Sequence, residues 1–272
     1  MRNLTIAFFH LGYEPYQHYT LQLAMERTPR AKVVLLTDTP SGYPKGVEVV
    51  DIRKKYEADI AAFKACYEHR STNSYMFEHS SLLRWIIYAD WWKENACNSI
   101  FVADSDVMIF SDLYEERKAW LKYDYTLSQG TAGGQSFWNN PGALEKLRKL
   151  ILFVYTYPDD RKARSILGHY DNLQKAGLPG GVCDMTFLDF LRRRSGYRCG
   201  ETIEPTASGM LDHNILMAQG FEHDGTRKVV RWKDGTPYCR HNNGQDVKMH
   251  TLHMSCSKDL IEDFYNQSKV RA

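Results

Sequence analysis

Short apolar runs alternate with longer amphipathic segments over the first 115 residues of the chain. Four apolar runs have the length of buried strands, at residues 4–9, 32–36, 47–52 and 100–103. Three longer segments have a helical pattern, at residues 16–26, 56–69 and 76–95. Strands that alternate with helices form a mostly parallel sheet flanked by helices, so the pattern predicts an α/β fold.

The pattern becomes less regular after Trp120. Asn140 is a good N-cap and Pro141 suits a first helical turn, so we expect a helix over 143–155. Two further helices are predicted at 184–194 and 257–267. The polar stretch 232–248 predicts a long loop. We find no linker, and residues 1–272 are therefore predicted to form a single domain.

Composition excludes several classes of protein. Lys and Arg number 35 against 33 Asp and Glu, and this near-balance argues against a nucleic-acid partner. Apolar residues make up 43% of the chain, enough for a sizeable core. No run approaches the roughly 18–20 apolar residues of a membrane span, and the first ten residues lack a signal-peptide pattern. Six scattered cysteines suit reduced thiols, so we expect a cytoplasmic protein.

Two carboxylates follow the predicted strand 100–103 directly, in Asp104-Ser105-Asp106. Residues i and i+2 of an extended segment point to the same side, so both carboxylates can converge on one point. Ligands of open α/β sheets bind beyond the carboxyl ends of the strands, where adjacent carboxylates favour a cation such as Mg²⁺ or Mn²⁺. The alternative is a solvated turn, but the apolar run 107–110 that follows argues against it.

The segment Phe101-Val-Ala-Asp-Ser-Asp-Val-Met-Ile-Phe-Ser-Asp-Leu113 resembles the signature of glycosyltransferases with the GT-A fold. It is closest to the glycogenin-like and galactosyltransferase-like enzymes of family 8. The resemblance implies that residues 1–115 form a Rossmann-like nucleotide-sugar-binding half and residues 116–272 an acceptor half. It also implies that Asp104 and Asp106 hold Mn²⁺ or Mg²⁺ against a diphosphate, that Ser105 contributes to cofactor binding, and that Asp112 starts the next helix.

The same resemblance assigns binding roles before this segment. The family places an Arg about twenty residues upstream, in contact with the nucleotide or its phosphates, and Arg84 occupies that position. The alternative for Arg84 is a solvated position on a helix. Asp38 resembles the acidic residue that meets the nucleoside. His10 and Leu11, at the end of the first strand, are also expected to contact the nucleoside.

Near the carboxyl terminus the family has a His followed by a phosphate-binding Lys. The corresponding segment here runs from His253 to Lys258, one residue shorter and without the family's Gly. We expect His253 to be the third metal ligand, with His250 as the alternative, and Lys258 to meet a phosphate at the start of the last helix. A structural zinc site is a competing interpretation of five nearby residues, Cys239, His241, His250, His253 and Cys256.

The middle of the chain is expected to hold the reacting centre. Gly133 and Gly134 lie where the family has a strand of small residues under the sugar. Asp184 matches the Asp of the family's Asp-Gln pair, while Met185 replaces the Gln tied to the retaining mechanism. Asp184 is therefore a candidate catalytic residue or, alternatively, only a helix N-cap. Asp212 is an alternative general base for an inverting reaction.

These expectations together describe a metal-dependent glycosyltransferase. The donor would be a nucleoside-diphosphate sugar, with a UDP-sugar favoured, and the acceptor a glycan or other hydroxyl compound. The resemblance favours retention of anomeric configuration. Two alternatives are a phosphatase resembling the haloacid dehalogenases, and a non-catalytic nucleotide- or glycan-binding protein of the same fold. Acceptor choice is expected to depend on the loops 128–142 and 232–248.

Overall fold

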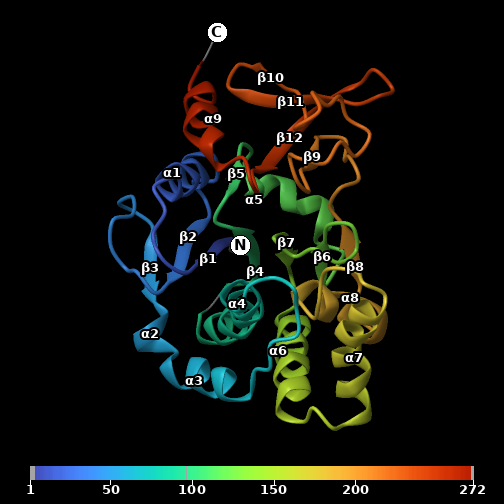
Figure 1. Ribbon diagram of the computed structural model, residues 1–272. Helices are drawn as coiled ribbons and strands as arrows, with labels where there is room; N and C mark the ends of the chain where they lie inside the picture. The colour runs from blue at the N-terminus through green and yellow to red at the C-terminus, as the bar shows by residue number, and fades with distance from the viewer. Residues whose placement is uncertain (1–3, 96, 271–272) are drawn as a thin grey trace.

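A computed structural model describes residues 4–95 and 97–270 of the chain. A seven-stranded sheet lies at its centre, with the order β3-β2-β1-β4-β7-β6-β8 (Figure 1). The strands are β3 (Glu48–Asp51), β2 (Lys32–Thr37), β1 (Leu4–His10), β4 (Ser99–Asp104), β7 (Gln135–Trp138), β6 (Tyr125–Leu127) and β8 (Cys199–Glu201). Strands β1 to β4 pair in parallel, as does β6 with β8, while β7 is antiparallel to both neighbours. The predicted α/β fold with a mostly parallel sheet is confirmed.

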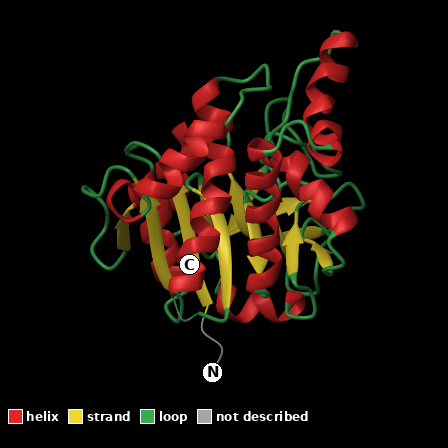
Figure 2. Ribbon diagram, turned by 90° about the horizontal axis from the view of Figure 1, so that it is seen from below, coloured by secondary structure: helices red, strands yellow, loops and turns green. Residues whose placement is uncertain are grey.

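Helices cover both faces of this sheet (Figure 2). They are α1 (Gln17–Arg27), α2 (Ile52–Lys55), α3 (Glu57–Cys66), α4 (Tyr75–Glu94), α5 (Leu113–Glu116), α6 (Pro141–Thr156), α7 (Arg161–Lys175), α8 (Asp184–Arg194) and α9 (Ile261–Gln267). Alternate side chains of β1 point to opposite faces: Ile6 and Phe8 pack toward α1, and Ala7 and Phe9 toward α4. Both faces are buried, which explains the uninterrupted apolar runs of the sequence.

The helix α4 is the most deeply buried of the long helices, with 11 of its 20 residues buried, among them Trp85 and Trp91. A helix that is apolar on nearly all sides packs inside the protein. Helices α2 and α7 were not predicted. No helix in the described ranges is both long and apolar enough to cross a bilayer.

A second, antiparallel sheet has the order β10-β11-β12-β5, with β9 also paired to β12. Its strands are β5 (Val107–Ile109), β9 (Met210–Leu211), β10 (Val230–Lys233), β11 (Thr236–Arg240) and β12 (Asp246–His253). The prediction of a long loop at 232–248 is therefore wrong. Asp234 and Gly235 both have positive φ between β10 and β11, as in a two-residue hairpin turn. β10 and β11 look polar in sequence because they are only partly buried, with Pro237 and Cys239 as their buried residues.

Several helix ends agree with the sequence and two do not. Asn140 caps α6 by accepting a hydrogen bond from the Gly142 amide, and Asp112 caps α5, as predicted. The bounds 184–194 of α8 are also confirmed. The N-cap of α8 is Cys183, however, so Asp184 is not a cap. The helix predicted over 257–267 begins as a 3-10 turn, η2 (Lys258–Leu260), and only then continues as α9.

Candidate functional site

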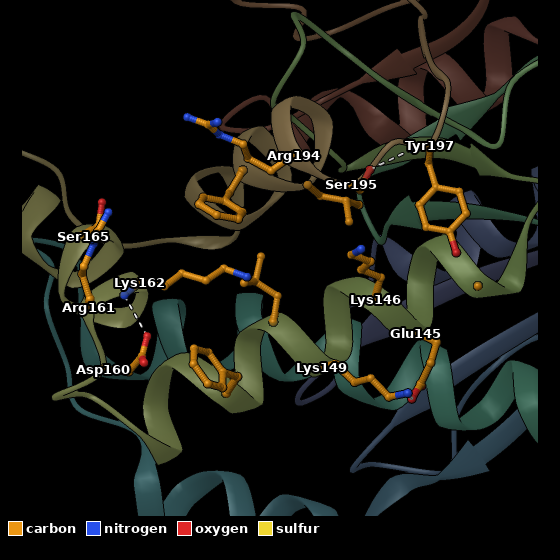
Figure 3. Close-up of a pocket in the computed structure, with 15 residues that line it drawn as sticks. Glu145, Lys146, Lys149, Asp160, Arg161, Lys162, Ser165, Arg194, Ser195 and Tyr197 are labelled. Atoms are coloured by element: carbon orange, nitrogen blue, oxygen red, sulfur yellow. Dashed lines mark hydrogen bonds and ion pairs between the residues drawn. The ribbon is translucent and has the colours of Figure 1, made fainter.

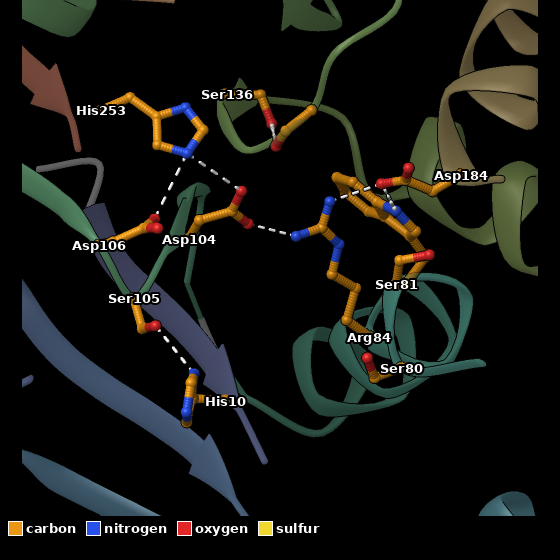
Figure 4. Close-up of polar contacts among 12 residues, drawn as sticks. His10, Ser80, Ser81, Arg84, Asp104, Ser105, Asp106, Ser136, Asp184 and His253 are labelled. Carbon is orange, nitrogen blue, oxygen red and sulfur yellow. Dashed lines mark hydrogen bonds and ion pairs between the residues drawn. The ribbon is translucent and has the colours of Figure 1, made fainter. Parts of the chain in front are cut away.

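Asp104, Asp106 and His253 meet where the two sheets join. Strand β4 ends at Asp104, the chain turns through Ser105 and Asp106, and β5 pairs antiparallel with β12, placing Val107 opposite His253. One ligand atom from each of the three side chains lies within 4.8 Å of the others. The His253 Nε2 is 3.3 Å from Asp106 Oδ1 and 3.6 Å from Asp104 Oδ2 (Figure 4). Of the two candidate histidines, the structure brings His253 to the carboxylates.

The donor set of this group suits a divalent cation. Asp106 Oδ1 is buried and accepts no hydrogen bond from the described residues. The His253 Nδ1 lies 2.8 Å from the His213 carbonyl, to which it donates, so Nε2 is the nitrogen that faces the carboxylates and that a metal ion could bind in place of a proton. Two carboxylate oxygens and one imidazole nitrogen are ligands that Mn²⁺ or Mg²⁺ accepts.

The electrostatics also indicate that positive charge belongs at this point. Burial lowers the pKa of His253, but the carboxylates of Asp106 and Asp104 raise it to about 9. Burial raises the pKa of Asp104 above its usual range. Burial acts the same way on Asp106, but His253 and Lys258 outweigh it and lower the pKa of that carboxyl. The carboxylates thus favour positive charge at this point, which a proton or a metal ion can supply.

Arg84 links this group to Asp184. Its guanidinium, on α4, forms ion pairs with the carboxylates of both Asp104 and Asp184. Only 14% of the Arg84 side chain is exposed, so the alternative of a solvated helix Arg is wrong. Asp184 is buried at the first position of α8, and its Oδ2 also accepts a hydrogen bond of 3.1 Å from Trp85 Nε1. Asp184 is therefore part of the site and not merely the start of a helix.

Gly134 packs directly against the carboxylate of Asp104. Its carbonyl accepts a hydrogen bond of 2.6 Å from the Asp104 amide. A Cβ at this position would lie 2.4 Å from Asp104 Oδ2 and 3.4 Å from His253 Cε1. The sequence predicts that glycines here allow close approach to a ligand, and the structure shows the close approach to be to Asp104 itself.

Ser105 and Lys258 complete the side of the site near β1. Ser105 Oγ lies 2.9 Å from both His10 Nδ1 and the Tyr16 hydroxyl. Lys258 Nζ is 3.7 Å from Asp106 Oδ2. Lys258 lies in the 3-10 turn η2, and the helix after it has only seven residues. The group available to an anion here is therefore the side-chain ammonium of Lys258 and not the N-terminus of a long helix.

A cavity of about 580 Å³ opens over these residues. Predicted residues that line it are His10, Leu11, Arg84, Asp104, Ser105, Asp106, Gly133, Gly134, Asp184, His253 and Lys258. Ser80 and Ser81 were missed, although they precede Arg84 by four and three residues and so share its helix face. His213 and Asn214 also line the cavity. Asp38 is not among the lining residues; its Oδ1 accepts a hydrogen bond of 2.6 Å from the Gly12 amide.

Two alternatives from the sequence are wrong. Asp212 is fully buried and pairs with the equally buried Lys228 at 2.8 Å, while its other oxygen accepts a hydrogen bond from the His253 amide. It is a structural ion pair and cannot serve as a general base for a substrate. The zinc interpretation fails because His250 lies apart, with its Nδ1 2.9 Å from Ser111 Oγ. Within the described ranges, Asp104, Asp106 and His253 are the one group of three such ligands.

No family model and no curated protein sequence matches the chain. Solved structures similar to it include the galactosyltransferase LgtC in complex with donor and acceptor sugar analogs, at 11% identity and a TM-score of 0.47, over 97% of this chain and 95% of that one. Mouse xyloside xylosyltransferase 1 is similar at 11% identity and a TM-score of 0.41, over 71% and 81% of the two chains. The glycosyltransferase GlyE of Streptococcus pneumoniae TIGR4 is similar at 13% identity and a TM-score of 0.37, over 74% of this chain and 45% of that one.

These three proteins are glycosyltransferases, the class that the segment 101–113 resembles. The chain spans less than half the length of GlyE. Similarity at this level is distant and carries no weight for activity, so the functional conclusion depends on the site itself.

Proposed function

We propose that the protein is a metal-dependent glycosyltransferase that moves a sugar from a nucleoside-diphosphate sugar to a hydroxyl group of a glycan or other acceptor. The observation that carries the proposal is the convergence of Asp104, Asp106 and His253 on one point beside a cavity. This point lies beyond the carboxyl ends of the parallel strands β1 and β4, where α/β sheets bind nucleotides.

In this proposal Asp104, Asp106 and His253 hold Mn²⁺ or Mg²⁺. When bound, such an ion neutralises the charge that develops on a diphosphate leaving group. Lys258 supplies a second positive charge next to Asp106, in place to meet a phosphate oxygen. His10 and Ser105, which contact each other, would position the nucleotide near the end of β1. We infer a UDP-sugar as the favoured donor from the resemblance alone.

Asp184 is the proposed catalytic residue. Its Oδ2 accepts from both Arg84 and Trp85, so Oδ1 is the oxygen left for the sugar or the acceptor. Arg84 lines the cavity and holds Asp184 and Asp104 in fixed relation, which orients both carboxylates. We infer retention of configuration, although Met185 stands where the family has Gln. Nothing in the structure or the comparisons supports the phosphatase alternative.

Hydrolysis of donor sugars tests this proposal. The full chain is incubated with a panel of nucleoside-diphosphate sugars and Mn²⁺, and nucleoside diphosphate release is followed. We expect release from one donor, loss of that release in EDTA, and loss in Asp106→Asn. Asp259→Asn is the matched control, because Asp259 is an exposed carboxylate beside Lys258 that contributes no metal ligand. Donor binding without any turnover would favour the non-catalytic binding protein instead.

A further inference from the structure

A second, larger cavity of about 1130 Å³ lies between helices α6, α7 and α8, outside the site described above (Figure 3). Its lining includes the apolar side chains Leu150, Phe153, Phe190 and Leu191. Leu150 and Leu191 are buried, and Phe153 and Phe190 are half-buried. The cavity therefore has an apolar floor that would contact the hydrocarbon part of a ligand.

The rim of this cavity is strongly basic. Five of its seven charged lining residues are cations: Lys146, Lys149, Arg161, Lys162 and Arg194. Both acids of the lining are already engaged, since Glu145 pairs with Lys149 at 3.3 Å and Asp160 caps α7. The excess of three positive charges is notable in a chain whose formal net charge is only +2. Such a concentration of one sign attracts a ligand of the opposite charge.

Lys162 and Lys146 are the cations best placed to meet that ligand. Figure 3 shows the Lys162 side chain extending across the middle of the cavity. Its ammonium lies 5.0 Å from the ring centre of Phe190 and 5.8 Å from that of Phe153. Within residues 4–95 and 97–270, neither Lys146 nor Lys162 has a carboxylate within 4.0 Å. Their charges are thus available to an anionic group, while the two rings would contact the apolar part of the same ligand.

Helix α8 connects this cavity to the proposed reaction site. Asp184 and Met185, at its start, line the cavity over Asp104, Asp106 and His253. Phe190 and Arg194, near its end, line the cavity between α6, α7 and α8. A hollow between them shares Cys183 and Met185 with the first cavity, and Phe190 and Arg194 with the second. Ten residue steps of an α-helix span about 15 Å, which sets the separation of the two ends.

We propose that the cavity between α6, α7 and α8 is a distal acceptor subsite, which binds an anionic group, phosphate or carboxylate, attached to an apolar body. The acceptor would lie along α8, with its reactive hydroxyl near Asp184 and its anionic group about 15 Å away, between Lys146 and Lys162. This assignment rests on the proposed function. It predicts that acidic acceptors are preferred to neutral ones.

The binding part is tested by calorimetric titration of the full chain with 1-naphthyl phosphate and with 1-naphthoate, in EDTA to prevent binding through a metal. The two probes distinguish phosphate from carboxylate, and neutral 1-naphthol is the uncharged comparison. We expect the double variant Lys146→Gln/Lys162→Gln to weaken binding of the preferred anion roughly tenfold, as the loss of two unpaired charges would. The matched control is Lys122→Gln/Lys175→Gln, which removes a lysine over a tyrosine ring and an exposed lysine of α7.

Equal binding by wild type and the cavity variant, an equal loss in the control variant, or naphthol binding as tightly as the anions would overturn the site. The acceptor part uses glycoside acceptors with an apolar aglycone, supplied in pairs with and without a terminal phosphate or carboxylate on that aglycone. We expect the acidic member to have the lower KM, and the Lys146→Gln/Lys162→Gln variant to abolish this difference while donor hydrolysis stays unchanged. Equal KM values within each pair refute the acceptor role. Failure to hydrolyse any donor refutes the proposed function, and calorimetry still decides whether the anion site exists.

Discussion

Gly134→Ala is the substitution for which the structure gives the most specific expectation. The new methyl group would lie 2.4 Å from Asp104 Oδ2, and side-chain Cβ atoms essentially never approach another heavy atom within 3.0 Å. Asp104 or the backbone of residue 134 must therefore move by at least the difference, about 0.6 Å. The Asp104 carboxylate cannot turn away freely, because Arg84 holds its other oxygen.

We expect a displacement of this size to lower activity strongly, because Asp104 is a proposed metal ligand, and to lower the stability of the fold only slightly. We expect donor hydrolysis to fall about a hundredfold, as is usual when a reacting group moves by roughly 1 Å. Overpacking costs about 1–3 kcal/mol, so the thermal midpoint should fall by roughly 2–10 °C with the protein still folded. Donor hydrolysis and thermal unfolding of the same sample measure the two effects.

Gly168→Ala is the control for this substitution. Gly168 lies in α7, and a Cβ there would meet no atom within 4 Å. We expect unchanged activity and a gain of up to about 1 kcal/mol in stability, because Ala favours helix. If Gly134→Ala retained wild-type hydrolysis, the close contact between Gly134 and Asp104 would not matter for the site.

Two further predictions concern stability. Lys228→Met leaves the buried Asp212 carboxylate without its partner, so we expect a loss of about 3–5 kcal/mol in urea unfolding; a loss below 1 kcal/mol would contradict the buried pair. Burial lowers the pKa of His250 to about 4 from 6.5, so between these values the unfolded chain takes up a proton that the folded chain excludes. Stability should therefore fall by about 3 kcal/mol from pH 6.5 to pH 4, and His250→Gln should show a clearly smaller fall in urea unfolding across that range.

Local patterns predicted the first half of the fold well. The strands β1, β2 and β4 are continuous apolar runs because both their faces are buried, and such runs are visible without knowledge of partners. The second sheet was missed because β10 and β11 are only partly buried and mix Lys, Arg and Thr with Trp and Cys. Its existence depends on pairing with β12, a contact between segments that a local pattern does not reveal.

The site was predictable where a motif carries it and not where distant segments meet. Asp104 and Asp106 follow from two carboxylates after a buried strand, and His253 from its distance to Lys258 in sequence. The bridge from Arg84 to Asp184 joins residues a hundred positions apart, and only the packing of α4 beside α8 creates it. The burial of Asp212 with Lys228 was equally hidden, because neither residue lies in an apolar run.

Thermal unfolding with nucleoside diphosphates tests the central claim, a metal–diphosphate site at Asp104, Asp106 and His253, most directly. Each nucleotide is added with Mn²⁺, Mg²⁺ or EDTA to wild type, Asp106→Asn and the control Asp259→Asn. A ligand at a hundred times its Kd adds about 2.7 kcal/mol, which should raise the midpoint by several degrees. We predict a rise that requires one nucleotide together with the metal ion and disappears only in Asp106→Asn. A rise that persists in EDTA and in Asp106→Asn, or no rise with any nucleotide, would contradict the account.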